Sequence, residues 1–257
     1  MLRLIYYPFN ALVTLFENFG RFVLLLSKVF KKIDNKNLFL NNSLQQMVLL
    51  GSKSIPIVIL TSFFTGLVGS VQAAYQMESS LVPAWYIGSL VGETVLLELA
   101  PVITCLVLAG RVGATITAEI GAMRVTEQID ALEALSHDPV KYLVIPRVLA
   151  ASIMLPLLVG IADIIGFLSG LLVAKVLVNM NHFAYFNSAQ LMLGPFDIVG
   201  GLIKAVVFGF VISLISCYRG LNSGAGAKGV GETTTRAVVQ SLMTVFVLNY
   251  FLTILLF

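Results

Sequence analysis

The chain has 257 residues, of which 58% are hydrophobic and only 11% are charged, and its mean hydropathy is +0.95. Soluble domains carry about a quarter charged residues, so this composition excludes a water-soluble globular protein. The formal net charge of +3 says little about partners, because in a membrane protein the positions of the cations carry the information. Two cysteines in apolar runs and two distant histidines indicate neither a metal site nor a disulfide framework.

Residues 1–36 begin apolar and aromatic and then become basic. The charge follows the apolar part and no small-residue cleavage site is present, so a cleaved signal peptide is not expected. This pattern predicts an N-terminal amphipathic helix that lies in the membrane interface. The polar, Asn-rich stretch 34–42 is expected to be a short connection.

Five apolar runs follow, and a bilayer crossing needs about 20 apolar residues. They cover about 55–74, 84–109, 147–175, 200–217 and 237–257. If the N-terminus is cytoplasmic, all of the 16 Lys and Arg residues except Lys175 and Lys204 fall on the inner side. The sequence therefore predicts an all-α integral membrane protein with five spans, a cytoplasmic N-terminus and a C-terminus on the outer side.

Small residues recur at helix-contact spacing in two of these runs, as Gly88 with Gly92 and Gly166 with Gly170. Such pairs let two helices approach closely in lipid. They indicate either packing within the chain or an interface between subunits.

The segment after the second run holds many of the acidic residues. Gly110 and Gly113 flank Arg111 and predict a tight turn where the chain leaves the membrane. A cytoplasmic amphipathic helix is then expected over about 119–135, and Pro139 would end it soon afterwards. Its apolar face would carry Val125, Ile129 and Leu132, and its acidic face Glu127, Asp130 and Glu133. Membrane-surface helices are normally basic, so the acidic face favours a protein partner over a helix resting on lipid headgroups.

Ionisable residues at membrane depth are functional candidates because each costs about 2.5–3.5 kcal/mol at the bilayer centre. Glu98 lies three residues before Pro101, whose ring denies a hydrogen bond to the carbonyl of Leu97. Glu93 is about 140° away from Glu98 on a helix, so the two do not form a paired acid/base site. Asp163 is expected to pair with a polar group of another helix.

Asp197 and Lys204 share a helix face, about 10 Å apart along the axis. The lysine either snorkels to the outer surface or meets an anionic headgroup inside a cavity. The Gly-rich loop 222–231 lacks the GxxxxGK[ST] order of a phosphate-binding loop. No GxSxG, HExxH or Ser/His/Asp arrangement supports an enzyme, and no cofactor is expected.

Over residues 45–257 the chain resembles the MlaE/YrbE permease family, the membrane subunits of ABC-type lipid transporters. Three stretches carry the resemblance: Glu98-Leu99-Ala100-Pro101, AGRVGATITAEIGAMRVTEQIDALEALSHDP at 109–139, and GVGETTTRAVV at 229–239. The resemblance implies a single MlaE-type permease domain in the bacterial inner membrane. It further implies a homodimer that moves lipids, phospholipids above all, between this membrane and a periplasmic MCE-domain protein, and so contributes to outer-membrane lipid asymmetry.

The same resemblance implies partners and site residues. A cytoplasmic ABC ATPase, which binds the ATP, would dock on the coupling helix at about 119–135, and a STAS-domain protein would join the ATPase. The coupling residues would be Glu119, Met123, Glu127, Gln128, Asp130 and Glu133. The lipid cavity would include Glu98, Leu97, Leu99, Lys204, Asp197, Arg236 and Asn249. Many members carry Arg at the position of Leu97 and an acid at that of Asn249, so headgroup contacts at these two positions differ here.

Two other functions are compatible with these residues. An intramembrane lipid-modifying enzyme would use Glu98 as its acid or base, and it would yield chemically altered lipid. A membrane scaffold would only recruit proteins, and substitutions of Glu98 and Lys204 would then leave its function intact.

Overall fold

The computed structural model describes residues 20–29, 36–78 and 86–257, and within these ranges it contains helices and no strand. Five helical segments in this part of the chain are long and apolar enough to cross a membrane, which confirms the predicted all-α, five-span architecture. They are Asn42–Tyr75, Ile87–Val125, Val140–Leu177, Phe196–Leu221 and Gly226–Leu256.

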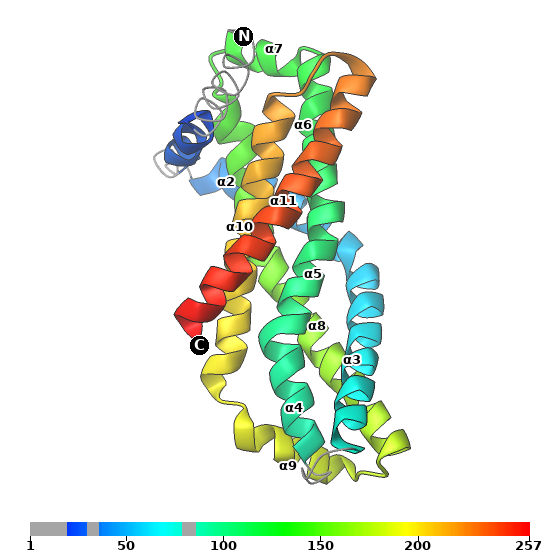
Figure 1. Cartoon of the computed structure of the whole chain (residues 1–257). Helices are drawn as coiled ribbons and strands as arrows, with labels where there is room; N and C mark the ends of the chain where they lie inside the picture. Colours follow the sequence, from blue (N-terminus) through cyan, green and yellow to red (C-terminus); the bar gives the residue numbers. More distant parts are fainter. Residues whose placement is uncertain (1–19, 30–35, 79–85) are drawn as a thin grey trace, which may run out of the picture.

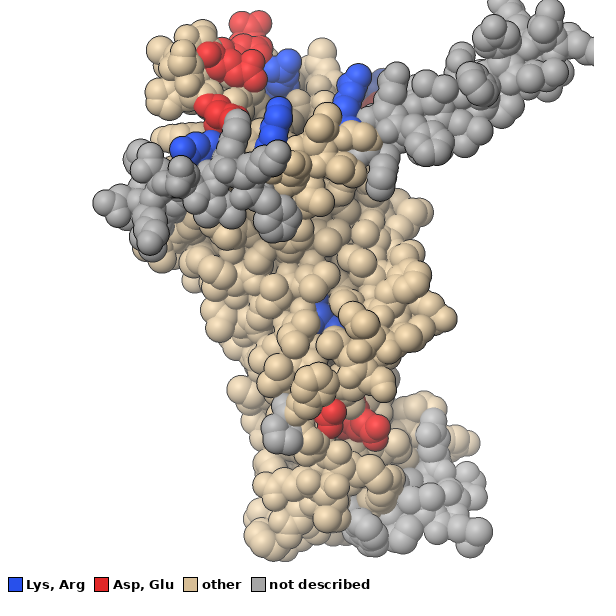
Figure 2. Space-filling view, turned by 90° about the vertical axis from the view of Figure 1, so that its left-hand side faces the viewer, with Lys and Arg blue, Asp and Glu red and all other residues tan. Residues whose placement is uncertain are grey.

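The helices form an elongated bundle (Figure 1). Most of its visible charged side chains gather at one end (Figure 2). We call it the charged end. It carries α7 (Gln128–Ala134) and the turn between α10 (Pro195–Leu221) and α11 (Gly226–Leu256). Figure 2 shows that the surface below this end is mostly uncharged, apart from small basic and acidic patches. This belt is the surface expected to meet the hydrocarbon of a bilayer.

The second span is a single continuous rod of 39 residues, about 58 Å long by helical rise. The predicted exit turn at Gly110 and Gly113 is wrong, because these residues lie in a π-helical turn inside the rod. A Cβ atom at Gly113 would lie 3.0 Å from Oγ of Ser216, so this glycine permits close approach to α10 instead of a turn. The rod consists of α4 (Ile87–Thr94), η3 (Val95–Leu99), α5 (Ala100–Leu108), η4 (Ala109–Gly113) and α6 (Ala114–Val125).

The predicted continuous helix over 119–135 is also wrong, because the structure divides it into α6 and α7. Glu127 adopts the left-handed conformation, with φ of 60°, and turns the chain between the two helices. α7 then lies across the charged end (Figure 1). Ile129 is 2% exposed and holds α7 on the bundle, whereas Val125 is 38% exposed and does not join the predicted apolar face.

The N-terminal part differs from the sequence interpretation in one respect. Residues 36–42 of the Asn-rich stretch that was expected to be a connection belong to α2 (Lys36–Leu50), and residues 34–35 lie outside the described ranges. A short 3₁₀ turn, η1 (Ser52–Ser54), then leads into α3 (Ile55–Glu78). α2 mixes polar and apolar residues, and its second half belongs to the first membrane-crossing segment, Asn42–Tyr75.

Only part of the predicted interfacial helix over 1–36 is described, since residues 1–19 and 30–35 lie outside the described ranges. Residues 20–29 are helical, and Leu25 and Val29 are buried against the bundle. The ring of Phe22 meets that of Tyr218 edge to face, with 5.7 Å between centroids. This short helix therefore packs on the charged end of α10.

The remaining helices complete the bundle: η5 (Val140–Val144), α8 (Ile145–Leu177) and α9 (His182–Met192), which crosses the end opposite the charged end (Figure 1). The two glycine pairs pack within the chain. A Cβ atom at Gly88 would lie 2.3 Å from the carbonyl oxygen of Tyr185 in α9, and one at Gly170 would lie 2.5 Å from Oγ of Ser70 in α3. Asp163 on α8 does not form the predicted pair, because its buried Oδ1 has no hydrogen-bond partner in the described chain.

Candidate functional site

Three spans bring four polar side chains together deep in the apolar belt. The Nζ atom of Lys204 on α10 lies 2.5 Å from Oε1 of Glu98 on η3. Asn249 on α11 donates to Oε2 of Glu98 at 3.1 Å, and the hydroxyl of Thr253 lies 2.8 Å from Oε1 and 2.9 Å from the lysine. We call Glu98, Lys204, Asn249 and Thr253 the polar cluster. It joins the second, fourth and fifth spans through one carboxylate.

Lys204 also forms a hydrogen bond with a backbone carbonyl that lacks a donor because of Pro101. Its ammonium donates to the carbonyl of Leu97 at 3.2 Å, the group to which a proline nitrogen cannot donate. Glu98 itself lies in a π-helical turn, which offsets the helical register just before the proline. The lysine therefore compensates a local defect of the second span while it neutralises the carboxylate.

Close helix contacts hold the lysine inside the protein. A Cβ atom at Gly201 would lie 2.8 Å from the carbonyl oxygen of Leu96, so α10 approaches the backbone of the second span directly. The ring of Phe257 at the end of α11 covers Lys204, with 5.1 Å between Nζ and the ring centroid. Lys204 has no exposed surface, which excludes the interpretation that it snorkels to the outer surface.

The two charges of the cluster differ in access. The side chain of Glu98 is 36% exposed, whereas that of Lys204 is 0% exposed. Asn249 supplies an N–H donor to the carboxylate, which an acid at this position could not do. The asparagine therefore leaves one negative and one positive charge in the cluster, and the carboxylate is the more accessible of the two.

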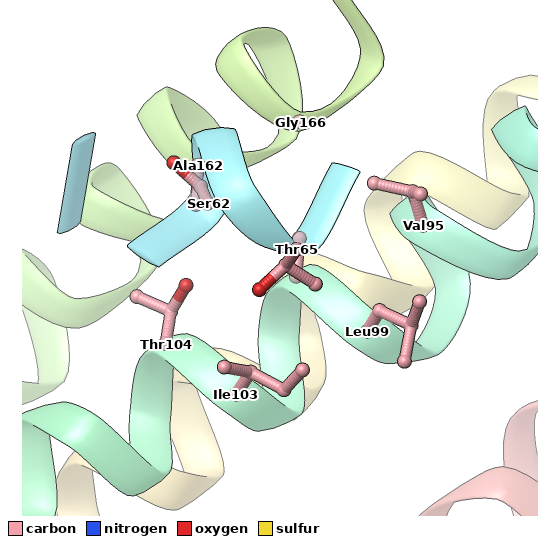
Figure 3. Close-up of a pocket in the computed structure, with 9 residues that line it drawn as sticks. Ser62, Thr65, Val95, Leu99, Ile103, Thr104, Ala162 and Gly166 are labelled. Carbon is pink, nitrogen blue, oxygen red and sulfur yellow. The ribbon is translucent and has the colours of Figure 1, made fainter. Parts of the chain in front are cut away.

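Leu99 does not join the polar cluster, although it follows Glu98 directly. It lines a small, mostly apolar space between α3 and the second span, together with Thr65, Val95 and Ile103 (Figure 3). Its Cδ1 atom would lie 3.5 Å from a Cβ at Gly69. Leu99 therefore belongs to the packing between the first and second spans.

Two other predicted cavity residues lie elsewhere. Asp197 accepts a hydrogen bond from the backbone of Gly194 at 2.7 Å and thereby caps the start of α10. Arg236 is 71% exposed near the start of α11 and lies 3.8 Å from Glu232, one helical turn away. Their roles in a cavity stay predictions.

A model of one protein family matches this chain over residues 43–255, and its description is "Permease MlaE". The chain belongs to the MlaE permease family. The match includes the four residues of the polar cluster and all but the first and last residue of the five spans.

Three relatives illustrate the range of similarity. A probable ABC transporter permease protein of Rickettsia prowazekii is 46% identical over 241 residues, which cover 94% of this chain and 93% of the relative. A probable ABC transporter permease protein of Synechocystis is 42% identical over 238 residues, covering 91% and 88%. The chloroplastic protein TRIGALACTOSYLDIACYLGLYCEROL 1 of Arabidopsis thaliana is 40% identical over 211 residues, covering 82% of this chain and 60% of the plant protein. This MlaE permease is thus a multi-pass transporter subunit, and an ABC permease implies an ATPase partner.

The predicted coupling residues of this permease fall into two groups. Met123 is half-buried against the core, and Glu119 pairs with the buried Arg147 of α8 at 3.1 Å. The other four are exposed at the charged end and surround the left-handed turn and α7: Glu127, Gln128, Asp130 and Glu133. Asp130 forms an ion pair with Arg124 across that turn. The exposed group is the part that a soluble partner can reach.

Thr253 is the member of the polar cluster that the sequence interpretation missed. It lies four residues after Asn249 and therefore on the same face of α11, and its hydroxyl also lies 2.9 Å from the carbonyl oxygen of Asn249. The sequence signal for this residue was a hydroxyl side chain one helical turn after an amide side chain in an apolar span. In the described chain, no group of three or more His, Cys, Asp or Glu side chains is placed to hold a metal ion.

Proposed function

We propose that this permease moves phospholipids between the bacterial inner membrane and a periplasmic MCE-domain protein, driven by a separate ABC ATPase. In this proposal the chain has no catalytic residue and no cofactor of its own, because the ATPase binds the ATP. The transported lipid would help to maintain outer-membrane lipid asymmetry. The observation that carries the proposal is the polar cluster, whose carboxylate remains accessible at membrane depth.

The physical argument concerns the cost of that carboxylate. A charge at the bilayer centre costs several kcal/mol, so an accessible one faces water, a polar ligand or protein and not acyl chains. Lys204 lies directly behind Glu98 and offers a positive charge to a phosphate when the carboxylate moves aside. In a hydrated cavity the phosphate of a phospholipid headgroup satisfies Lys204, and water or a cationic headgroup amine satisfies Glu98. The plant relative is named after a lipid, trigalactosyldiacylglycerol, and this name also supports a lipid substrate.

A second copy of the chain would complete the cavity. Only 11% of the most apolar stretch of α11 is buried inside the subunit. The helix exposes large apolar side chains such as Phe246, Tyr250 and Phe251. Glu98 is bound by side chains of this same helix. In the proposed homodimer the two half-exposed carboxylates therefore face a shared space between the subunits.

We place the charged end in the cytoplasm, because cations accumulate on that side of a membrane. The N-terminus is then cytoplasmic and the C-terminus faces the periplasm, where the MCE protein would sit. The ATPase would dock on the exposed acidic side chains around α7, with a STAS-domain protein beside it. An acidic surface suits a protein partner better than the anionic cytoplasmic leaflet.

The docking proposal is tested by the charge reversals Glu127→Arg and Asp130→Arg. The complex is purified by an affinity tag on the full-length permease. We expect ATP hydrolysis to lose its stimulation by lipid, or the ATPase to stop co-purifying, because α7 then repels its partner. Glu232→Arg is the matched control, since Glu232 is an exposed acid at the start of α11. Unchanged co-purification together with unchanged lipid-stimulated hydrolysis would refute the docking role.

The transport proposal is tested in proteoliposomes that contain the complex, labelled phospholipid and the acceptor protein. We expect chemically intact lipid to reach the acceptor only when ATP is hydrolysed. An altered lipid product would favour an intramembrane enzyme that uses Glu98. Normal transfer by both Glu98→Ala and Lys204→Ala variants would favour a scaffold.

A further inference from the structure

A second polar cavity lies near the charged end, well away from the polar cluster. It has a volume of about 290 Å³ and lies between the connection from α2 to α3 and the junction of α5 with α6. Lys53 and Ser54 line it from the connection between α2 and α3. Arg111, Thr115 and Glu119 line it from the second span. Arg111 lies about 20 Å from Glu98 along the same rod, so the two sites are distinct.

The residues in and beside this cavity carry more positive than negative charge. In the described chain, neither the ammonium of Lys53 nor the guanidinium of Arg111 has a hydrogen bond or an ion pair. The one acid of the lining, Glu119, lies 3.1 Å from Arg147, which is 6% exposed and carries its own positive charge. The cavity with its immediate support therefore has three cations and one anion.

The hydroxyl groups of the lining are already committed to the backbone. Ser54 donates to the carbonyl of Leu50 at 2.6 Å, and Thr115 donates to that of Arg111 at 2.8 Å. The donors that remain free for a ligand are the ammonium of Lys53 and the guanidinium of Arg111. A planar guanidinium beside a mobile ammonium matches the oxygens of a phosphate group. The site thus selects for negative charge and not for a pattern of sugar or amine hydrogen bonds.

The depth of the cavity indicates the source of the phosphate. Lys53 lies two residues before α3, whose apolar run begins at Ile55. Leu49, Leu50 and Val112 complete the lining and give it an apolar side. A phosphate with an apolar continuation, at the boundary between charged surface and apolar belt, is the chemistry of a glycerophospholipid headgroup.

We propose that Lys53 and Arg111 bind the phosphate of an anionic glycerophospholipid of the leaflet at the charged end. The volume is close to the lower limit of about 300 Å³ for small-molecule sites, so the cavity accommodates one headgroup and not a whole lipid. This lipid is a bound component at the permease surface and does not have to be the transported molecule. The proposal therefore stands whether or not the polar cluster transports lipid.

The test is native mass spectrometry of the full-length protein, purified in mild detergent and supplied with phosphatidylglycerol or phosphatidylcholine. We expect retention of phosphatidylglycerol, and about fivefold weaker retention for each cation removed in Lys53→Gln and Arg111→Gln. The matched control is Lys141→Gln with Lys228→Gln, which removes two positive charges at the same end but outside this cavity. Equal loss in the control, or equal retention of phosphatidylcholine by the wild type, would overturn the proposal.

A second measurement separates a headgroup from free phosphate. In nanodiscs of phosphatidylcholine, inorganic phosphate at constant ionic strength should leave the thermal unfolding midpoint unchanged, whereas added phosphatidylglycerol should raise it. A rise with phosphate alone would overturn the lipid assignment. If the Gln variants do not fold, the exchange Lys53→Arg with Arg111→Lys preserves both charges. It should keep phosphatidylglycerol bound, and loss of the lipid from a folded exchange variant would contradict the proposal.

Discussion

The polar cluster and the turn before α7 contain the same kind of ion pair in opposite surroundings. Lys204 and Glu98 have 0% and 36% of their side chains exposed, and a hydroxyl and an amide complete the contacts of the carboxylate. Arg124 and Asp130 pair across the turn with 42% and 52% exposed. Water solvates the second pair almost as well when it is broken, so its net contribution is small. The buried lysine has no such alternative.

A third pair lies between these extremes. Arg147 on α8 is 6% exposed and donates to Glu119 on α6 and to the carbonyl of Leu143 at 3.0 Å. Its Nε atom is buried without a partner. Glu119 is 36% exposed and opens onto the cavity beside Lys53. Burial of the cation thus falls from Lys204 through Arg147 to Arg124, and the contribution of each acid should follow that order.

The largest effect is expected from Glu98→Gln. This change leaves the ammonium of Lys204 buried with neutral partners only, and breaking a buried pair on one side costs about 3 kcal/mol. Denaturant titration of the detergent-solubilised protein measures the free energy of unfolding. Glu93→Gln is the matched control, because Glu93 is an exposed acid in the same rod with no ion pair in the described chain. Equal stability of the two variants would contradict the structural role of the cluster.

An intermediate effect is expected from Glu119→Gln. The amide keeps one acceptor oxygen for Arg147 but removes the opposing charge, which corresponds to a loss of about 1.5 kcal/mol. The same titration measures this loss. A loss as large as that of Glu98→Gln would mean that the half-exposed carboxylate of Glu119 is not solvated from the cavity.

The smallest effect is expected from Asp130→Asn. The exposed pair with Arg124 should contribute less than about 0.5 kcal/mol, and high salt should remove most of that contribution. Titration at low and high salt measures it. A larger, salt-independent loss would show that the ion pair holds the left-handed turn at Glu127 in place.

The helix break at Glu127 illustrates a limit of sequence reasoning. The pattern of Val125, Ile129 and Leu132 predicts one helix, and no glycine or proline marks the turn that the structure places there. A non-glycine residue in the left-handed region is uncommon and costs energy. It is tolerated because Ile129 becomes buried on the far side of the turn. That gain depends on the other helices and is not visible in a local pattern.

The sequence predicted the close helix contacts of some glycines correctly but assigned Gly113 a wrong role. Contact spacing predicted close helix approach at Gly88 and Gly170, and both are packed against another helix of this chain. Gly113 was assigned to a turn although it serves the same purpose against α10. A glycine permits both a turn and a close contact, so only the position of the neighbouring helix distinguishes them.

The sequence alone determined the all-α membrane class and the five spans, because the length and hydropathy of a segment decide whether it can cross a bilayer. It also predicted the open carbonyl of Leu97, since the geometry of proline is local. Only the tertiary structure decided that Lys204 donates to this carbonyl, that Asn249 and Thr253 complete the polar cluster, and that Leu99 lines a space beside α3. The reason is that these partners come from different spans, and their meeting depends on how α10 and α11 pack against the second span.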